Sequence, residues 1–345
     1  MKVAQGVFKK DTGLVIGVII LIAISLIILR SIAPFVFPLY FVYLIVAIAL
    51  FIFFSQIDFD SISLFYVYFY IGSIFLLIAP LVIGQVTRGT VRWIPLGPIA
   101  IQPAEIVRPF LLVFFAKFYT LREVSVKRFL VSNFLFLVPF FLILVQPSLG
   151  VAIMTAVGYL GIVIASTFKK KYLVGFAVIC AVLAPLLWQF LAPYQKGRIL
   201  SFISGTDSSY NSIQSMIAVG SGRFLGMGLG KGVETQLAFL PEKHTDFVFA
   251  AISEELGFVG AALTVCVIFF VLYRIIKILE VSQGVGARIF ISGMFLTLFV
   301  QVVVHIGMNM GLFPITGLPL PLVSAGGSSL VATMIALGMV IGAKK

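Results

Sequence analysis

The chain has 345 residues, of which 61% are hydrophobic and only 10% charged, and its formal net charge is +12. Soluble domains carry about 25% charged residues, so this composition excludes a soluble domain and indicates a polytopic membrane protein. The long runs are apolar on every side, which excludes the alternating strands of a membrane barrel. Membrane topology and anionic headgroups explain the positive charge more simply than nucleic acid does.

The apolar runs predict an all-α protein with about ten transmembrane helices in a single domain over residues 1–345. The expected spans are Gly13–Leu29, Phe35–Phe54, Ile62–Val82, Ala104–Tyr119, Phe129–Val145, Gly150–Thr167, Tyr172–Leu191, Phe258–Ile278, Ile289–Met310 and Leu322–Ile341. The first is too long for a signal peptide and lacks a small-residue cleavage site, so we expect it to be retained. The fourth is short and begins with polar residues, which is also compatible with a partly re-entrant segment.

The distribution of basic residues predicts the orientation. With a cytoplasmic N-terminus, most of the 24 Lys and Arg residues fall in short cytoplasmic loops, as the positive-inside rule requires. The even number of spans then returns the C-terminus to the cytoplasm. On this topology Lys243 lies outside and Lys170 inside.

The longest connection, about 192–257, is predicted to be extracytoplasmic, and a long loop in a compact protein is usually functional. The loop over 83–103 is the second candidate, on the same side. The stretch 240–256 concentrates ionisable side chains: Glu242, His244, Asp246, Glu254 and Glu255. ATP and NAD are scarce outside the cytoplasm, which argues against a nucleotide site.

The glycine-rich run "GSGRFLGMGLGKG" does not meet the spacing of a Walker motif. Leu225 occupies the first glycine position, and Gly232 follows Lys231 where Ser or Thr is required. We therefore expect a flexible re-entrant loop rather than a phosphate cradle.

Two polar groups near the fourth span each allow a structural and a functional interpretation. Glu105 and Arg108 share one helix face and can pair, either lining a cavity or holding the helix in the headgroup region. Trp93 is either an interfacial anchor or, with Arg92, a contact for a sugar or phosphate. The cysteines Cys180 and Cys266 fall inside spans and are interpreted as small core residues.

Asp246 precedes the eighth span, where a carboxylate commonly caps a helix, and Glu254 and Glu255 would then lie in its first turns. A metal site made by Glu242, His244 and Asp246 has suitable ligand atoms but no geometric signature, so none is predicted.

Several basic residues are predicted outside, against the positive-inside rule, and an anionic lipid-linked pyrophosphate would compensate them. They are Arg88, Arg92, Lys196, Arg198, Arg223, Lys231 and Lys243. A carboxylate among such cations stays ionised and can act as a base.

Five motifs in this order resemble the SEDS family, the RodA, FtsW and SpoVE type of peptidoglycan glycosyltransferase. They are "RWIPLGPIAIQPAEIVR" (Arg92–Arg108), "QPSLG" (Gln146–Gly150), "IQSMIAVGSGRFLGMGLGKG" (Ile213–Gly232), "FLPEKHTDFVFAAISEELG" (Phe239–Gly257) and "PITGLPLPLVSAGGSSL" (Pro314–Leu330).

The resemblance implies a multi-pass protein of the bacterial cytoplasmic membrane that polymerises lipid II, undecaprenyl-pyrophosphate-linked disaccharide pentapeptide, on the outer face for elongation or division. It also implies a class B penicillin-binding protein as partner, together with elongasome or divisome membrane proteins. The essential carboxylate of the family falls on Asp246. Trp93 and Glu105 match two further family positions.

The sequence departs from the family pattern at several motif positions. Ala104 and Arg108 stand where Ser and Lys are common, Ser148 replaces an aspartate and Ala325 replaces a tyrosine. These changes leave the "HTDF" motif around Asp246 unchanged, but they leave the subfamily undecided.

The expected mechanism takes Asp246 as general base, with outward cations holding the pyrophosphates. The expected substrate contacts are Arg92, Trp93, Arg198, Arg223, Glu242, Lys243 and His244, and the expected supporting residues are Gln102, Glu105, Arg108, Ser324 and Ser328. Assistance by Mg²⁺ or Mn²⁺ is left open.

Two rival functions are considered, a lipid II flippase and a scaffold for partner proteins. A transporter should hold its charges near the bilayer midplane, whereas here they gather in outside loops and helix ends. A scaffold would leave the ionic cluster without a purpose.

Overall fold

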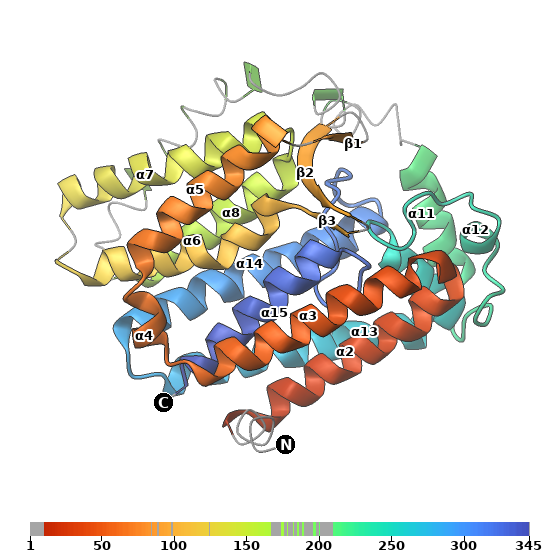
Figure 1. The fold of residues 1–345 in the computed structure, drawn as a ribbon. Coiled ribbons are helices and arrows are strands. Elements are labelled where there is room, and N and C mark those ends of the chain that lie inside the picture. The colour runs from red at the N-terminus through yellow and green to blue at the C-terminus, as the bar shows by residue number, and fades with distance from the viewer. Residues whose placement is uncertain are drawn as a thin grey trace. The chain divides into compact units, whose positions relative to one another are not determined.

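The computed structural model describes residues 10–83, 85–87, 90–97, 99–123, 125–166 and 210–344, with isolated positions between 174 and 200. Helices dominate this part of the chain (Figure 1). The helices are α2 (Thr12–Ile32), η1 (Pro34–Val36), α3 (Phe37–Gln56), α4 (Phe59–Ser63), α5 (Tyr66–Ile83), α6 (Pro103–Thr120), α7 (Val126–Val145), α8 (Leu149–Ala165), α11 (Tyr210–Ser221), α12 (Val233–Gln236), α13 (Val248–Val281), α14 (Val285–Asn309) and α15 (Gly327–Gly342).

Six described helical segments are long and apolar enough to cross a membrane: Thr12–Ile32, Pro34–Gln56, Tyr66–Ile83, Val126–Val145, Val248–Val281 and Val285–Asn309. The prediction of a polytopic all-α membrane protein is therefore confirmed. Helices α6, α8 and α15 match three more predicted spans. Most of the expected span Tyr172–Leu191 lies outside the described residues.

Two helix boundaries differ from those expected. Helix α13 begins at Val248, well before the predicted Phe258, because it continues through a kink at Gly257, where φ is 68° and ψ is −166°. The apolar run that begins at Phe258 is thus the second half of a kinked helix. Helix α15 begins at Gly327 instead of Leu322.

A small antiparallel sheet occupies the loop between α5 and α6, where the sequence indicated no strand. Its strands are β1 (Gln85–Thr87), β2 (Thr90–Leu96) and β3 (Ile99–Ile101), hydrogen-bonded in the order β1-β2-β3. In the β2–β3 hairpin Leu96 pairs with Ile99 across a turn at Gly97, whose φ of +65° favours glycine.

The chain divides into two compact units. Unit 1 comprises Met1–Ile52, Gly197–Ile276 and Leu298–Met334. Within it α2 packs along α13 at a glycine, since a Cβ on Gly17 would lie only 2.6 Å from the Val271 side chain. The Asp11 carboxylate at the start of α2 forms an ion pair of 2.9 Å with Arg274.

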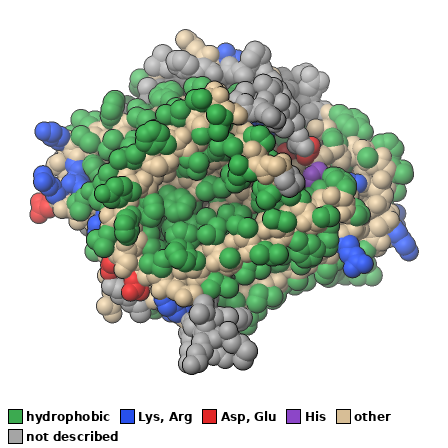
Figure 2. Space-filling model, in the orientation of Figure 1, with side chains coloured by type: hydrophobic (Ala, Val, Ile, Leu, Met, Phe, Trp, Pro, Cys, Tyr) green, Lys and Arg blue, Asp and Glu red, His purple; other side chains and the backbone are tan. Residues whose placement is uncertain are grey.

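Unit 2 comprises Phe53–Lys196, Lys277–Thr297 and Ile335–Lys345. Its core is aromatic: Tyr159 of α8 stacks on Phe136 of α7 with ring centroids 4.3 Å apart, and Phe115 of α6 meets Tyr159 edge-on. A Cβ on Gly161 would lie 2.9 Å from the Gly293 Cα, so α8 and α14 approach closely. Apolar side chains cover most of the visible helix surfaces, and Lys and Arg gather near helix ends (Figure 2).

Candidate functional site

Asp246 lies in a tight turn two residues before α13. The backbone oxygen of Glu242 accepts hydrogen bonds from the N–H groups of Thr245 at 3.1 Å and of Asp246 at 3.0 Å. Glu242 itself has a φ of 52°, a conformation that costs free energy outside glycine and that recurs at functional sites. The turn leaves the Asp246 side chain partly exposed.

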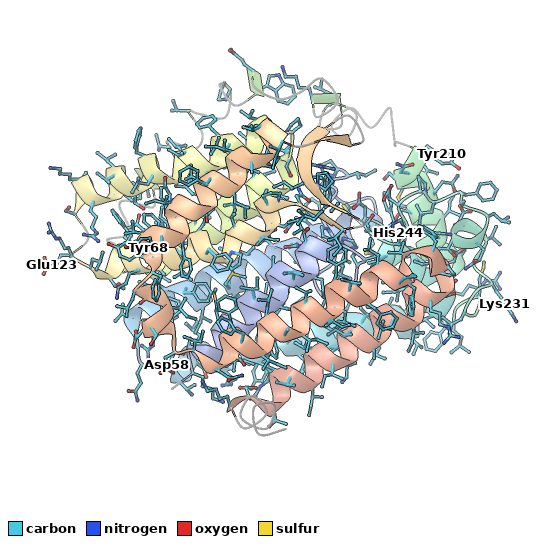
Figure 3. All side chains as sticks on the ribbon, in the orientation of Figure 1. Asp58, Tyr68, Glu123, Tyr210, Lys231 and His244 are labelled. Carbon is cyan, nitrogen blue, oxygen red and sulfur yellow. The ribbon has the colours of Figure 1, made fainter. Side chains whose placement is uncertain are left out.

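The segment before α15 closes over this turn from the other end of the chain. The Ser324 hydroxyl donates to the Thr245 oxygen at 2.7 Å, and the Ala325 N–H donates to the His244 oxygen at 2.8 Å. The His244 ring meets Phe35 edge-on, with centroids 5.7 Å apart. His244 is labelled beside these elements in Figure 3.

The same segment places backbone against the Asp246 carboxylate. A Cβ built on Gly317 would lie 3.6 Å from Oδ2 of Asp246, and Gly317 has a φ of +67°. The Asp246 carboxylate therefore lies between its own turn and a loop about 70 residues further along the chain. The positive φ of Gly317 in this loop is a conformation that glycine adopts readily.

Glu254 and Glu255 lie in the early turns of α13, which begins at Val248, and both are fully buried. Glu254 accepts hydrogen bonds from the backbone N–H groups of Glu234 at 2.8 Å and Thr235 at 3.0 Å. Glu255 accepts from the Gly230 N–H at 3.1 Å and from the Gln236 side chain at 2.9 Å. Glu255 thus binds the glycine-rich run, and Glu254 binds the first turn of α12, which follows that run.

The glycine-rich run docks on the kink of α13. The Met227 N–H donates to the Glu254 oxygen at 2.9 Å and the Gly228 N–H to the Glu255 oxygen at 3.0 Å. A Cβ on Gly226 would lie 2.2 Å from that Glu255 oxygen. The N–H groups of Met227 and Gly228 thus bind backbone oxygens of α13 and fix the run on this helix.

The cations of the predicted site have different environments. The Lys243 ammonium donates to the Thr235 oxygen, and burial lowers the pKa of this amine while the nearby Glu255 and Glu254 carboxylates oppose the shift. Arg223 is exposed and has a φ of 49°. Arg198 lies outside the described residues.

The remaining predicted residues form a buried polar group in unit 2. Glu105 and Arg108 make the ion pair expected from their spacing, and both side chains are buried. The Gln102 amide donates to the Ser148 hydroxyl at 3.2 Å, joining the starts of α6 and α8. Arg92 and Trp93, half-buried, belong to β2 of the same unit.

The predicted residues thus divide between the two units. Unit 1 holds Asp246, Glu242, Lys243, His244, Arg223, Ser324 and the buried Ser328, while unit 2 holds the residues around Glu105. Among the residues that the structure describes, no group of three or more His, Cys, Asp or Glu side chains could hold a metal ion, so Glu242, His244 and Asp246 form no such cluster.

Asn309, a residue that the sequence analysis did not select, touches the Asp246 turn directly. Its amide nitrogen donates to the backbone oxygen of Asp246 at 3.1 Å, and its amide oxygen accepts from the Ala250 N–H at 3.0 Å. The sequence signal that could have identified it is the spacing of Gln301, His305 and Asn309, three polar residues at intervals of four in an apolar span. Burying polar side chains in a membrane span costs free energy unless they form hydrogen bonds.

The described helices include six that are long and apolar enough to cross a membrane, and the partly exposed Asp246 lies in the turn just before α13. These features define a multi-pass membrane protein with a candidate acid–base site. A family model described as "Cell cycle protein", for FtsW, RodA and SpoVE, matches residues 9–345. The chain belongs to this family.

Similar proteins carry consistent names. The chain is 38% identical over 283 residues to the peptidoglycan glycosyltransferase MrdB of Escherichia coli strain K12, covering 79% of this chain and 76% of that protein. It is 32% identical to the probable peptidoglycan glycosyltransferase FtsW of Nitrosococcus halophilus, covering 75% of this chain and 69% of that protein.

Two solved structures resemble this chain over nearly its whole length. One comes from work on a peptidoglycan synthase complex that coordinates polymerization and crosslinking, with a TM-score of 0.82, 30% identity and 96% of each chain covered. The other is the rod shape determining protein RodA of Thermus thermophilus, with a TM-score of 0.73 and 28% identity, covering 96% of this chain and 95% of that one.

Proposed function

We propose that this chain is a peptidoglycan glycosyltransferase that polymerises lipid II into β-1,4 glycan strands, with Asp246 as general base. The observation that carries the proposal is the Asp246 carboxylate, partly exposed yet held between the Glu242 turn and Gly317. The names of the family relatives support the reaction class.

In the reaction, the 4-hydroxyl of an acceptor GlcNAc attacks the anomeric carbon of a donor MurNAc. The new C–O bond forms as the bond to polyprenyl pyrophosphate breaks, and the hydroxyl proton passes to the Asp246 carboxylate. Attack from the opposite face converts the α-linked donor into a β-1,4 product. The leaving pyrophosphate carries away the electron pair, and cations stabilise it.

We assign the cationic role to Arg92, Arg198 and Arg223. An exposed guanidinium offers paired donors that match phosphate oxygens, and Arg223 is exposed within the glycine-rich run. Glu105 and Arg108 are proposed to support the site indirectly, because they are buried and paired with each other.

The proposal also specifies the side of the membrane on which the Asp246 turn lies and the class of partner protein. The N- and C-termini lie in the cytoplasm and the Asp246 turn lies outside, as the distribution of Lys and Arg favours. A class B penicillin-binding protein would crosslink the strands, and the likeness to a chain of a peptidoglycan synthase complex supports such an assembly.

The deciding experiment measures lipid II polymerisation in proteoliposomes for the wild type and Asp246→Asn, each with and without the class B partner. Removing a general base lowers the rate by about 10²- to 10⁴-fold. Asp58→Asn is the matched control, since Asp58 is exposed and remote in sequence from the turn. A wild-type rate from Asp246→Asn would show that Asp246 is not the general base. Lipid II transport by the wild type without polymer formation would favour the flippase.

A further inference from the structure

Three polar side chains form a ladder on one face of the C-terminal half of α14. Gln301, His305 and Asn309 follow each other at intervals of four residues, so they lie above one another on the helix. All three are buried in unit 1, His305 and Asn309 completely. Buried polar groups in a membrane span are costly and call for bonding partners.

Two rungs of this ladder bind the loop that precedes α15. The Gln301 amide donates to the Pro319 oxygen at 2.8 Å. His305 Nδ1 lies 2.7 Å from the Leu318 oxygen. A carbonyl oxygen only accepts, so Nδ1 carries the proton in this contact. The next residue toward the N-terminus is Gly317, whose added Cβ would lie 3.6 Å from the Asp246 carboxylate.

The third rung binds the turn that carries the carboxylate. The Asn309 amide nitrogen donates to the Asp246 oxygen at 3.1 Å and to the His305 oxygen at 2.8 Å. Its amide oxygen accepts from the Ala250 N–H at 3.0 Å, in the first turn of α13. Asn309 therefore connects the Asp246 turn to the first turn of α13.

We propose that Asn309 and His305 are positioning residues for Asp246. Asn309 fixes the turn from which the carboxylate projects, and His305 fixes the loop against which it rests. The inference rests on the proposed function, because it assigns the ladder to the placement of the base. A base displaced by about 1 Å from its hydrogen-bonding position can lose about 10²-fold in rate while substrate binding is kept.

The test compares steady-state polymerisation of lipid II by Asn309→Ala and His305→Leu with the wild type. We expect kcat to fall by about 10- to 100-fold and KM for lipid II to stay within about twofold. His305→Asn is the rescue variant, because its amide can donate to the Leu318 oxygen from nearly the position of Nδ1, and it should recover most of the lost kcat.

Ser215→Ala is the matched structural control. The Ser215 hydroxyl donates to the Asn309 backbone oxygen at 2.9 Å, so its loss removes a buried bond from the same residue without touching Asp246. We expect a lower unfolding temperature with unchanged kcat. If Asn309→Ala at equal folded fraction keeps the kcat of Ser215→Ala, or if His305→Asn is as slow as His305→Leu, the inference is wrong.

Measuring Asp246→Asn in the same series separates this inference from the proposed function. An active Asp246→Asn overturns the assignment of the base itself. An inactive Asp246→Asn beside fully active ladder variants overturns only the positioning role. If Asn309→Ala does not fold, the His305→Leu and His305→Asn pair decides alone.

Discussion

The Glu254 carboxylate, in the interior of helix α13, accepts a hydrogen bond of 3.0 Å from the backbone N–H of Thr235. A second bond of 2.8 Å comes from the Glu234 N–H, and the side chain is fully buried. One carboxylate thus satisfies the first free N–H groups of α12, which have no partner inside their own helix.

Glu254→Gln should lower the free energy of unfolding by about 1–3 kcal/mol, since it replaces a charged acceptor and turns an NH₂ group toward buried donors. Thermal unfolding in detergent micelles measures the change. Glu280→Gln is the control, because Glu280 makes a half-exposed pair with Lys277, and such pairs contribute less than about 1 kcal/mol. Equal effects of the two variants would contradict the contact assigned to Glu254.

Gly226→Ala should destabilise the protein by at least about 2 kcal/mol, because a Cβ there collides with backbone and forces a strained φ. The added atom would lie 2.2 Å from the Glu255 oxygen and 2.6 Å from the Gly257 nitrogen, at a φ of +83°. Gly72→Ala in helix α5 provides the contrast, since nothing lies within 4 Å and alanine favours a helix. A Gly226→Ala protein as stable as Gly72→Ala would show that the run does not dock on the kink.

Glu234 makes stability depend on pH. Burial, and then the negative charge of Glu254, raise the pKa of the Glu234 carboxyl from its ordinary value of 4.5. The folded protein then binds this proton more tightly than the unfolded chain, so its stability falls as pH rises through the window above 4.5.

Glu234→Gln should therefore be more stable than the wild type at pH 7.5, by less than about 1 kcal/mol because the group is only partly buried. The difference should disappear once pH falls below about 4.5, where the carboxyl is protonated in the unfolded chain as well. Unfolding temperatures of both proteins across this range provide the test. A difference that stays constant with pH would assign the effect to packing instead of charge.

The buried pair of Glu105 and Arg108 should respond differently to single and double substitution. Glu105→Gln or Arg108→Met alone leaves one buried charge uncompensated, which costs about 3–5 kcal/mol. The double variant removes both charges and should recover most of that loss. Additive losses in the double-mutant cycle, measured by thermal unfolding, would contradict a coupled pair.

Orientation can be tested with a thiol reagent that does not cross membranes. In a background with Cys180→Ser and Cys266→Ser, we expect Lys231→Cys to be labelled in intact spheroplasts and Arg122→Cys only after permeabilisation. Both positions are exposed. Labelling of Arg122→Cys in intact spheroplasts would reverse the proposed topology.

Local sequence spacing predicted those parts of the molecule that depend on one segment only. The apolar runs located the described spans, and the separation of Glu105 and Arg108 predicted their pair. Asp246 was identified as the base through the resemblance of its motif, since its position alone favoured a helix cap.

The features that escaped prediction depend on contacts between distant segments. Glu255 binds Gly230 close to the bend of α13 at Gly257, and the periodicity of the sequence does not predict that bend. The polar spacing of Gln301, His305 and Asn309 was visible in the sequence, but only the fold shows that Asn309 lies beside Asp246. The sheet after α5 was missed because β1 and β3 have only three residues each, so no alternating pattern marks the partners of β2.

The ion pair between Asp11 and Arg274 has a consequence for synthesis of the protein, because its members are 263 residues apart. Asp11 leaves the ribosome at the start of translation, long before Arg274 is made. The ion pair therefore cannot form until most of the chain has been synthesised, and it joins the first helix to α13 as a late contact in assembly.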